Sequence, residues 1–120
     1  MSNSVSDIAA PRTAQSGKRA AHPVAFTRGE LARILAVYGQ FVAAGDWKDY
    51  AIDCLKDAAV FSVYRKASEA PLYRIEKRPK LARKQGAWVI ISMSGAVLKR
   101  GGDLGQVLKA FDRQRLKLAT

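Results

Sequence analysis

The first periodic pattern of apolar residues in the chain has the spacing of a helix. Its members are three and four positions apart, which places them on one helical face: Leu31, Ile34, Leu35, Tyr38, Phe41 and Val42. Thr27 and Glu30 have the spacing of a capping box before this pattern. Gly45 stands where a left-handed residue commonly ends a helix. The pattern predicts a helix over residues 28–44.

From Tyr50 onward the period shortens and strand-forming residues predominate. Short runs of β-branched and aromatic residues are separated by turn signals, and they cover 50–55, 59–65, 72–78, 88–93 and 96–98. Pro79 ends the third run because proline cannot donate to a ladder. Gly95 supplies the positive φ of a hairpin turn between the last two. About five short antiparallel strands are therefore expected.

A second helix is predicted after the break at Gly101 and Gly102. Asp103 and Gln106 repeat the capping-box spacing, and an apolar stripe follows at Leu104, Val107, Leu108 and Phe111. The order of helix, strands and helix predicts an α+β fold with one antiparallel sheet and both helices packed on one face. Residues 116–118 fit either a continuation of this helix or an edge strand.

The chain before residue 26 shows neither the helical nor the strand period of apolar residues. Residues 1–25 contain Ser, Ala, Pro and scattered charges, with too little apolar surface to offset the entropy of ordering. We expect 1–25 to be a disordered basic tail and 26–120 to be a single α+β domain, since 120 residues leave little room for a second core.

The net charge indicates which kinds of partner the protein could bind, and the cysteine content indicates its cellular compartment. Lys and Arg number 21 against ten Asp and Glu, giving a net charge of +11, which favours an anionic partner: nucleic acid, a membrane surface or an acidic protein. Neither helix is strongly basic on one face, which disfavours a membrane surface. No apolar run approaches the roughly 20 residues that span a bilayer. The single cysteine, Cys54, excludes an internal disulfide, and together these features favour a soluble cytoplasmic protein.

The sequence offers little material for catalysis. The only histidine, His22, lies in the predicted tail, so a positioned imidazole base or a catalytic triad is not expected. Cys54 is interpreted as a packed strand residue. Phosphate-binding and dinucleotide-binding glycine motifs are missing, and ligands for a metal are too few. We therefore expect no catalytic residue, no metal and no cofactor.

Positive charge concentrates between residues 65 and 100. Ten cations stand there against Glu69 and Glu76, a net of eight positive charges: Arg65, Lys66, Arg74, Lys77, Arg78, Lys80, Arg83, Lys84, Lys99 and Arg100. Such concentration is typical of nucleic-acid-binding surfaces. Tyr64, Tyr73 and Trp88 would add stacking surfaces for bases, although each also fits a core position. The same cations also fit a solvated face or an edge guarded against pairing.

Strand alternation divides the third run between two faces. Arg74 and Glu76 are two residues apart and share one face. Tyr73, Ile75 and Lys77 point to the other face. The favoured interpretation is a non-enzymatic module that binds DNA or RNA through the cationic strand and loop. The alternative is a protein-interaction or regulatory subunit that docks an acidic protein.

Several segments together resemble one known family. They read Phe26-Thr-Arg-Gly-Glu-Leu, Ala36-Val-Tyr-Gly, Gly45-Asp-Trp-Lys-Asp-Tyr-Ala-Ile-Asp, Ala59-Val-Phe-Ser-Val-Tyr-Arg, Leu72-Tyr-Arg-Ile-Glu-Lys-Arg-Pro and Leu98-Lys-Arg-Gly. This set resembles the domain-of-unknown-function family 2794, small proteins of alphaproteobacteria, over residues 26–118. The resemblance implies a bacterial cytoplasmic protein of unassigned activity and supplies no site residue. Cys54 departs from the pattern, since the family more often has an aromatic residue there.

Overall fold

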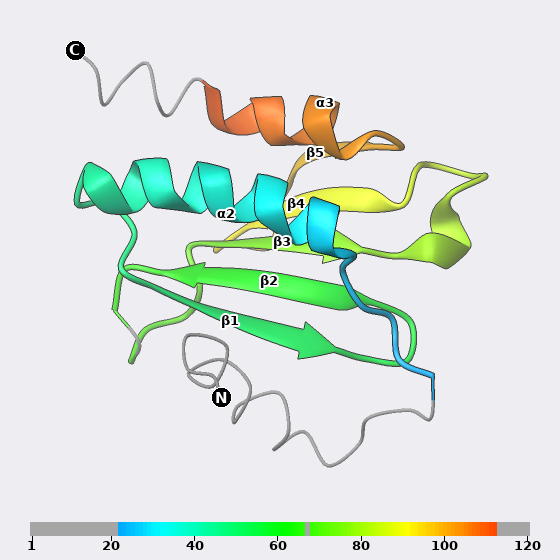
Figure 1. Ribbon diagram of the computed structural model, residues 1–120, viewed down its shortest axis with the longest axis horizontal. Helices are drawn as coiled ribbons and strands as arrows, with labels where there is room; N and C mark the ends of the chain where they lie inside the picture. The colour runs from blue at the N-terminus through cyan, green and yellow to red at the C-terminus, as the bar shows by residue number, and fades with distance from the viewer. Residues whose placement is uncertain (1–21, 67, 113–120) are drawn as a thin grey trace.

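The computed structural model describes residues 22–66 and 68–112, and it has the expected α+β architecture. Figure 1 shows helices α2 (Arg28–Ala43) and α3 (Leu104–Leu108) on the same side of one sheet. The sheet consists of β1 (Asp49–Cys54), β2 (Ala59–Tyr64), β3 (Tyr73–Lys77), β4 (Trp88–Ser92) and β5 (Val97–Gly101). Short 3₁₀ turns lie at Pro79–Leu81 and Lys109–Phe111.

The five strands form an antiparallel meander. Their order in the sheet is β1-β2-β3-β4-β5, so each strand pairs with its neighbour in sequence. The predicted strands are confirmed with small shifts at their ends. β5 is longer than expected because its pairing with β4 continues to Gly101, which lies opposite Trp88. β1 and β5 are the two edges of the sheet.

Helix α2 begins and ends as the sequence predicts. The Thr27 side chain accepts from the Glu30 amide, and the Glu30 side chain accepts from the Thr27 amide, which completes the capping box. Its buried residues are Ile34, Val37 and Phe41. Val42 was predicted to be buried and is 41% exposed, so that assignment is wrong. The buried stripe is centred on Ile34, Val37 and Phe41. Successive residues of a helix are turned by about 100° around its axis, so Val42, which follows Phe41, points away from this stripe.

The core on the helix side is built around Trp47, which is 1% exposed. Its ring stacks on Phe41 with centroids 4.3 Å apart and meets Phe111 at 5.3 Å. The ring of Tyr73 lies 5.9 Å away. Gly45, at φ 84°, turns the chain back after α2 so that Trp47 can reach this position. The cluster therefore joins α2, β3 and the C-terminal turn on one face of the sheet.

The other face of the sheet, called the second face below, points away from both helices. Val60 and Val89 are buried there, at 8% and 2% exposure, but neither belongs to the helix-side core cluster. Ser62 and Glu76 share this face because they alternate with the core residues Phe61 and Ile75. Glu76 pairs in register with Val60 and Val89. The second face is therefore partly apolar, with polar groups over β2 and β3.

The folded region begins slightly before the predicted boundary. The amide of Val24 donates to the carbonyl of Leu55 at 2.8 Å, so a residue assigned to the tail is attached to the domain. Residues 1–21 and the segment 116–118 lie outside the described part of the chain. Within 22–66 and 68–112, no helix has both the length and the apolar character needed to cross a membrane.

The loop between β3 and β4, residues 78–87, closes tightly against the end of β5. Gly86 has φ 91°, and a Cβ atom placed on it would lie 2.2 Å from the carbonyl carbon of Gly101. Both the conformation and the contact exclude a side chain at this position. Glycine is therefore required to hold the loop beside β5.

We expect Gly86→Ala to lower the free energy of unfolding by about 3 kcal/mol, because it adds a left-handed non-glycine residue and an overpacked contact. Urea denaturation measures the change. Gly95→Ala is the matched control, since Gly95 has φ 92° with nothing within 4 Å, and it should lose only about 1 kcal/mol. Equal losses for the two variants would show that the contact with Gly101 is unimportant.

Candidate functional site

The ten cations singled out in the sequence are divided between two ends of the sheet. Arg65 and Lys66 follow the last residue of β2, Tyr64, which pairs with Asp49. The β3–β4 loop follows Lys77, which pairs with Ala59 at the other end of β2. A strand of this length separates the two ends by roughly 17 Å. Arg65 and Lys66 therefore do not join the cations of the loop.

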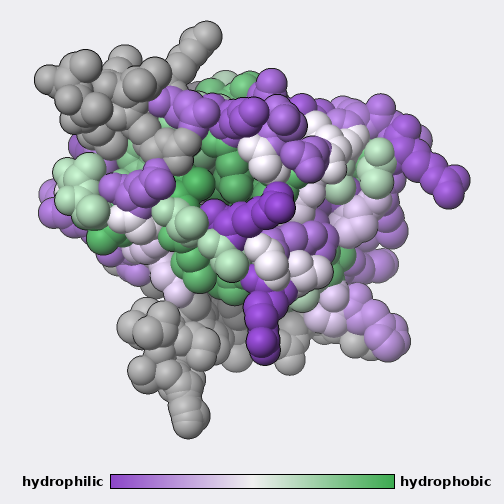
Figure 2. All heavy atoms as spheres, turned by 45° about the horizontal axis from the view of Figure 1, so that its top comes forward, coloured by the Kyte–Doolittle hydropathy of each residue, from purple (hydrophilic) through white to green (hydrophobic). Residues whose placement is uncertain are grey.

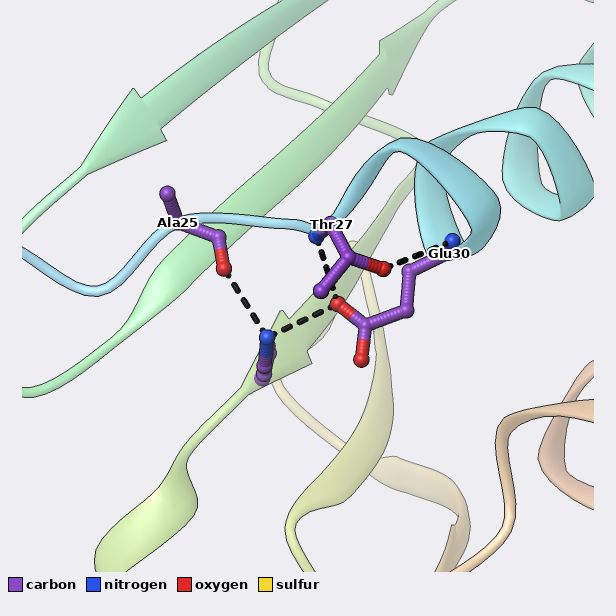
Figure 3. A network of polar contacts seen from close by, with 4 residues as sticks. Ala25, Thr27 and Glu30 are labelled. Atoms are coloured by element: carbon purple, nitrogen blue, oxygen red, sulfur yellow. Dashed lines mark hydrogen bonds and ion pairs between the residues drawn. The ribbon is translucent and has the colours of Figure 1, made fainter.

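Lys77 lies on the helix side and serves the fold. Figure 3 shows the network in which its ammonium donates to Glu30 Oε1 at 2.7 Å and to the carbonyl of Ala25 at 2.9 Å. The same ammonium is 6.0 Å from the centre of the Trp88 ring. Because Glu30 belongs to the capping box of α2, this ion pair ties the start of the helix to β3. Lys77 is thus neutralised and not available to an external anion.

The carboxylate of Glu30 is stabilised in its charged form. Burial acts to raise its pKa, but the hydrogen bonds from Lys77 and Thr27 and the charge of Lys77 outweigh burial. Its pKa is therefore lowered below the ordinary value of 4.5.

Two arginines converge on one buried carboxylate on the second face. Arg78 Nε donates to Glu76 Oε1 at 2.8 Å, and Arg74 Nε lies 3.3 Å from Glu76 Oε2. The Glu76 side chain is 7% exposed, whereas those of Arg74 and Arg78 are 38% and 40% exposed. Each arginine uses its Nε–H on Glu76, so the Nη groups of both guanidiniums remain for other partners. One carboxylate thereby orients two guanidiniums whose exposed parts face outward.

Arg100 adds a third guanidinium to this face. It pairs with Val89, which in turn pairs with Glu76, so Arg100 lies two strands, about 10 Å, from Glu76 in the same row. Its Nη1 atom is buried and has no hydrogen-bond partner in the described part of the chain. We refer to Arg74, Glu76, Arg78 and Arg100 as the arginine face. It carries a net charge of two.

The β3–β4 loop brings further cations to one end of the arginine face. Arg83 and Lys84 are exposed, and among residues 22–66 and 68–112 no carboxylate lies within ion-pair distance of either. The loop returns at Gly86 against Gly101, the residue after Arg100. Figure 2 shows hydrophilic side chains crowding the end of the molecule from which this loop projects, on the right of the view.

Lys80 and Lys99 are placed less favourably for binding an anion on the second face. Lys80 pairs with Asp57 at 2.9 Å, and its hydrogen bond and charge lower the pKa of that carboxyl. Both side chains are exposed, so this pair contributes little to stability. Lys99 pairs with Ile90, a core residue, and therefore faces the helix side at the edge of the sheet. Neither lysine belongs to the arginine face.

Of the three aromatic residues considered for stacking, two lie in the helix-side core. The Trp88 ring is stacked on Phe26 and the residue is 5% exposed. Tyr73 packs against Trp47 and Phe111. Tyr64 follows the core residue Val63 and so points to the second face. Tyr64 is therefore the one of the three that shares a face with the arginines.

This arrangement suits recognition of phosphate or carboxylate groups. A guanidinium presents paired N–H donors that match such oxygens in a bidentate geometry. Glu76 fixes two guanidiniums before any ligand arrives, which reduces the entropy lost on binding. With Arg83 and Lys84 included, the surface carries a net charge of four.

Sequence reasoning missed the carboxylates that pair with these cations. Glu30 meets Lys77 across 47 residues of sequence, and a local pattern carries no signal of that contact. The pairing of Glu76 with Arg74 and Arg78 could have been predicted from the sequence. Glu76 lies two residues from each arginine, and strand alternation places residues at that spacing on one face.

The comparisons with known proteins identify a family but no function. The model of a family described as a protein of unknown function (DUF2794) matches residues 24–108. This match confirms the resemblance seen in the sequence, and its start agrees with the attachment of Val24 to the domain. No curated protein and no solved structure matches the chain.

We expect Glu30→Gln to lower the free energy of unfolding by about 1–2 kcal/mol at neutral pH, because it weakens the charged hydrogen bonds with Lys77 and Thr27. The pKa of Glu30 is lowered in the folded state, so its stabilisation is complete above the ordinary carboxyl pKa and is lost as the pH falls through the folded value. The difference between the two proteins should therefore shrink in acid.

Urea denaturation from about pH 7 down to about pH 3 tests this expectation. Glu69→Gln is the matched control, since Glu69 is exposed and its replacement should change the free energy of unfolding by less than about 0.5 kcal/mol. A constant difference between Glu30→Gln and the parent protein across this range would mean that the ion pair does not stabilise the helix start.

Proposed function

This chain belongs to the DUF2794 family of proteins of unknown function, and we propose that it is a non-enzymatic module that binds nucleic acid. The arginine face and the loop cations Arg83 and Lys84 would contact the phosphates. The observation that carries the proposal is the convergence of Arg74 and Arg78 on the buried carboxylate of Glu76 through their Nε–H groups, which leaves the Nη groups for another partner. A surface that served only to balance charge would not need two arginines for one carboxylate.

The proposed interface includes only some of the ten cations. Arg74, Arg78 and Arg100 lie on the second face, and Arg83 and Lys84 are exposed in the loop that follows Arg78. Lys77 and Lys80 are engaged by carboxylates, Lys99 faces the helix side, and Arg65 and Lys66 lie at the far end. The interface is therefore smaller than the ten cations suggested, with about five phosphate contacts.

Contacts of this kind give affinity without sequence preference. Phosphate neutralisation releases counterions and operates on DNA and RNA alike. Tyr64 is the aromatic residue placed to add stacking on an unpaired base. A bacterial cytoplasmic location, in keeping with a single cysteine, would give the protein access to both nucleic acids.

We expect binding that weakens steeply with salt. With about five contacts, the slope of log K against log salt should be about −4.5 for duplex DNA and about −3.5 for a single strand. The double variant Arg83→Glu/Lys84→Glu should lose at least tenfold in affinity at low salt and reduce the slope by about 2. Fluorescence anisotropy with labelled duplex and single-stranded oligonucleotides measures both quantities.

The control is Arg65→Glu/Lys66→Glu, which makes the same change of charge at the other end of the sheet and should retain most of the affinity. Equal losses for the two double variants would show that only net charge matters. A flat salt dependence, or no binding at low salt, would overturn the proposal. In that case an acidic protein recovered from cells after nuclease treatment would favour the alternative, a subunit that docks an acidic partner.

A further inference from the structure

The β5 edge of the sheet is unpaired in the part of the chain that the structure describes. β5 is the last strand in the sheet order and pairs with β4 alone. The backbone N–H and C=O groups on its outer side therefore have no strand partner. Such an edge is a template for another extended segment. Lys99 and the irregular pairing beside Leu98 are partial guards on β5, so a partner must complement the positive charge of this edge.

Exposed apolar side chains gather at this edge. Within the described residues, five large apolar side chains are exposed, and three of them belong to the β4–β5 hairpin. Val97 and Leu98 in β5 are 50% and 43% exposed, and Met93 in the turn is 57% exposed. The other two, Val42 and Leu55, lie on α2 and after β1. Apolar surface of this kind is more typical of a contact surface than of a solvated strand.

The charge of the β5 edge indicates which kind of partner segment would bind there. Lys99 and Arg100 follow directly after Val97 and Leu98, and the sequence has no acidic residue from Met93 to Gly102. A second copy of the chain fits less well than an acidic segment. Two antiparallel β5 strands would set Lys99 and Arg100 of each copy against Leu98 and Val97 of the other, and the ribbon would hold four cations without a carboxylate. Opposite charges facing each other on paired strands stabilise the pairing. The partner should therefore be acidic.

We propose that β5 binds an extended acidic and apolar segment of a partner protein by strand addition. Residues directly opposite each other on paired strands share a face. Leu98 has no partner on β4, because Lys99 pairs with Ile90 and Val97 with Ile91, so β5 is bulged there. An antiparallel segment would therefore place two acids opposite Arg100 and Lys99, and two apolar residues against the bulged Val97-Leu98 end. Backbone hydrogen bonds from the outer side of β5 supply affinity, and the paired side chains supply specificity. This site shares Arg100 with the proposed phosphate interface but does not include the loop cations Arg83 and Lys84.

A synthetic peptide of matching pattern provides the probe. Titration of the ¹⁵N-labelled full chain with Thr-Thr-Glu-Glu-Ile-Val-Thr-Thr should shift the β5 amides and slow the exchange of those on its outer side at least tenfold. A peptide with Lys-Lys in place of Glu-Glu should bind at least tenfold more weakly. The acidic peptide with N-methylated amides at alternate residues should also lose binding, because it cannot complete the ladder.

Variants of the protein separate strand addition from loose electrostatic attraction. Val97→Glu/Leu98→Glu should weaken binding of the acidic peptide at least tenfold, and should weaken oligonucleotide binding less than Arg83→Glu/Lys84→Glu does. The matched control, Val42→Glu/Leu55→Glu, adds the same charge at exposed apolar positions elsewhere and should weaken the peptide less than threefold. Arg83→Glu/Lys84→Glu should also retain peptide binding, whether or not nucleic acid is bound through the loop.

Three results would overturn the proposal. Equal affinity for the N-methylated and unmodified peptides would exclude strand addition. Shifts confined to the β3–β4 loop, or no shifts at all, would exclude β5 as the site. A concentration-dependent dimer that Val97→Glu/Leu98→Glu dissolves would show that the occupant of the edge is a second copy.

Discussion

The contact of Trp47 with Phe41 and Phe111 is the interaction on which the arrangement of the molecule depends. It brings together residues from the first helix, the following loop and the last turn, and each pair of rings adds about 0.5–1.5 kcal/mol beyond the burial of its area. Both helices are thereby held on one face of the sheet. The second face carries the arginines and Glu76 beside the apolar Val60 and Val89, and the candidate site depends on this division.

The cations of the chain serve different purposes according to the face on which they lie. On the helix side, Lys77 is enclosed by Glu30, the Ala25 carbonyl and the Trp88 ring, and it fastens a helix to a strand. On the second face, Arg74 and Arg78 share one carboxylate and keep donors to spare. A difference of one residue along β3 therefore separates a structural cation from one suited to ligand binding, because side chains of a strand alternate.

Local patterns predicted most of the fold and only part of the site. Capping spacing and apolar period located α2 and the turn at Gly45, since these depend on neighbours in sequence. The same period predicted that Val42 would be buried, but Val42 is exposed. The width of a buried stripe depends on the elements that pack against the helix, and the period does not show them. Charge counting found the basic region but could not foresee that Lys77 would meet a carboxylate from another element, or that antiparallel pairing would carry Arg65 to the opposite end.

The position of Phe111 has a consequence for the order in which parts of the protein fold during synthesis. Hairpins between successive strands involve short loops, so they can form early while the chain is still being synthesised. The aromatic cluster lacks one of its rings until the chain has extended past β5 to Phe111. A nascent chain stopped short of that residue would leave Trp47 and Phe41 without one of the rings that cover them, so this part of the core would be more exposed to water. The aromatic core is therefore complete only after synthesis of the last turn.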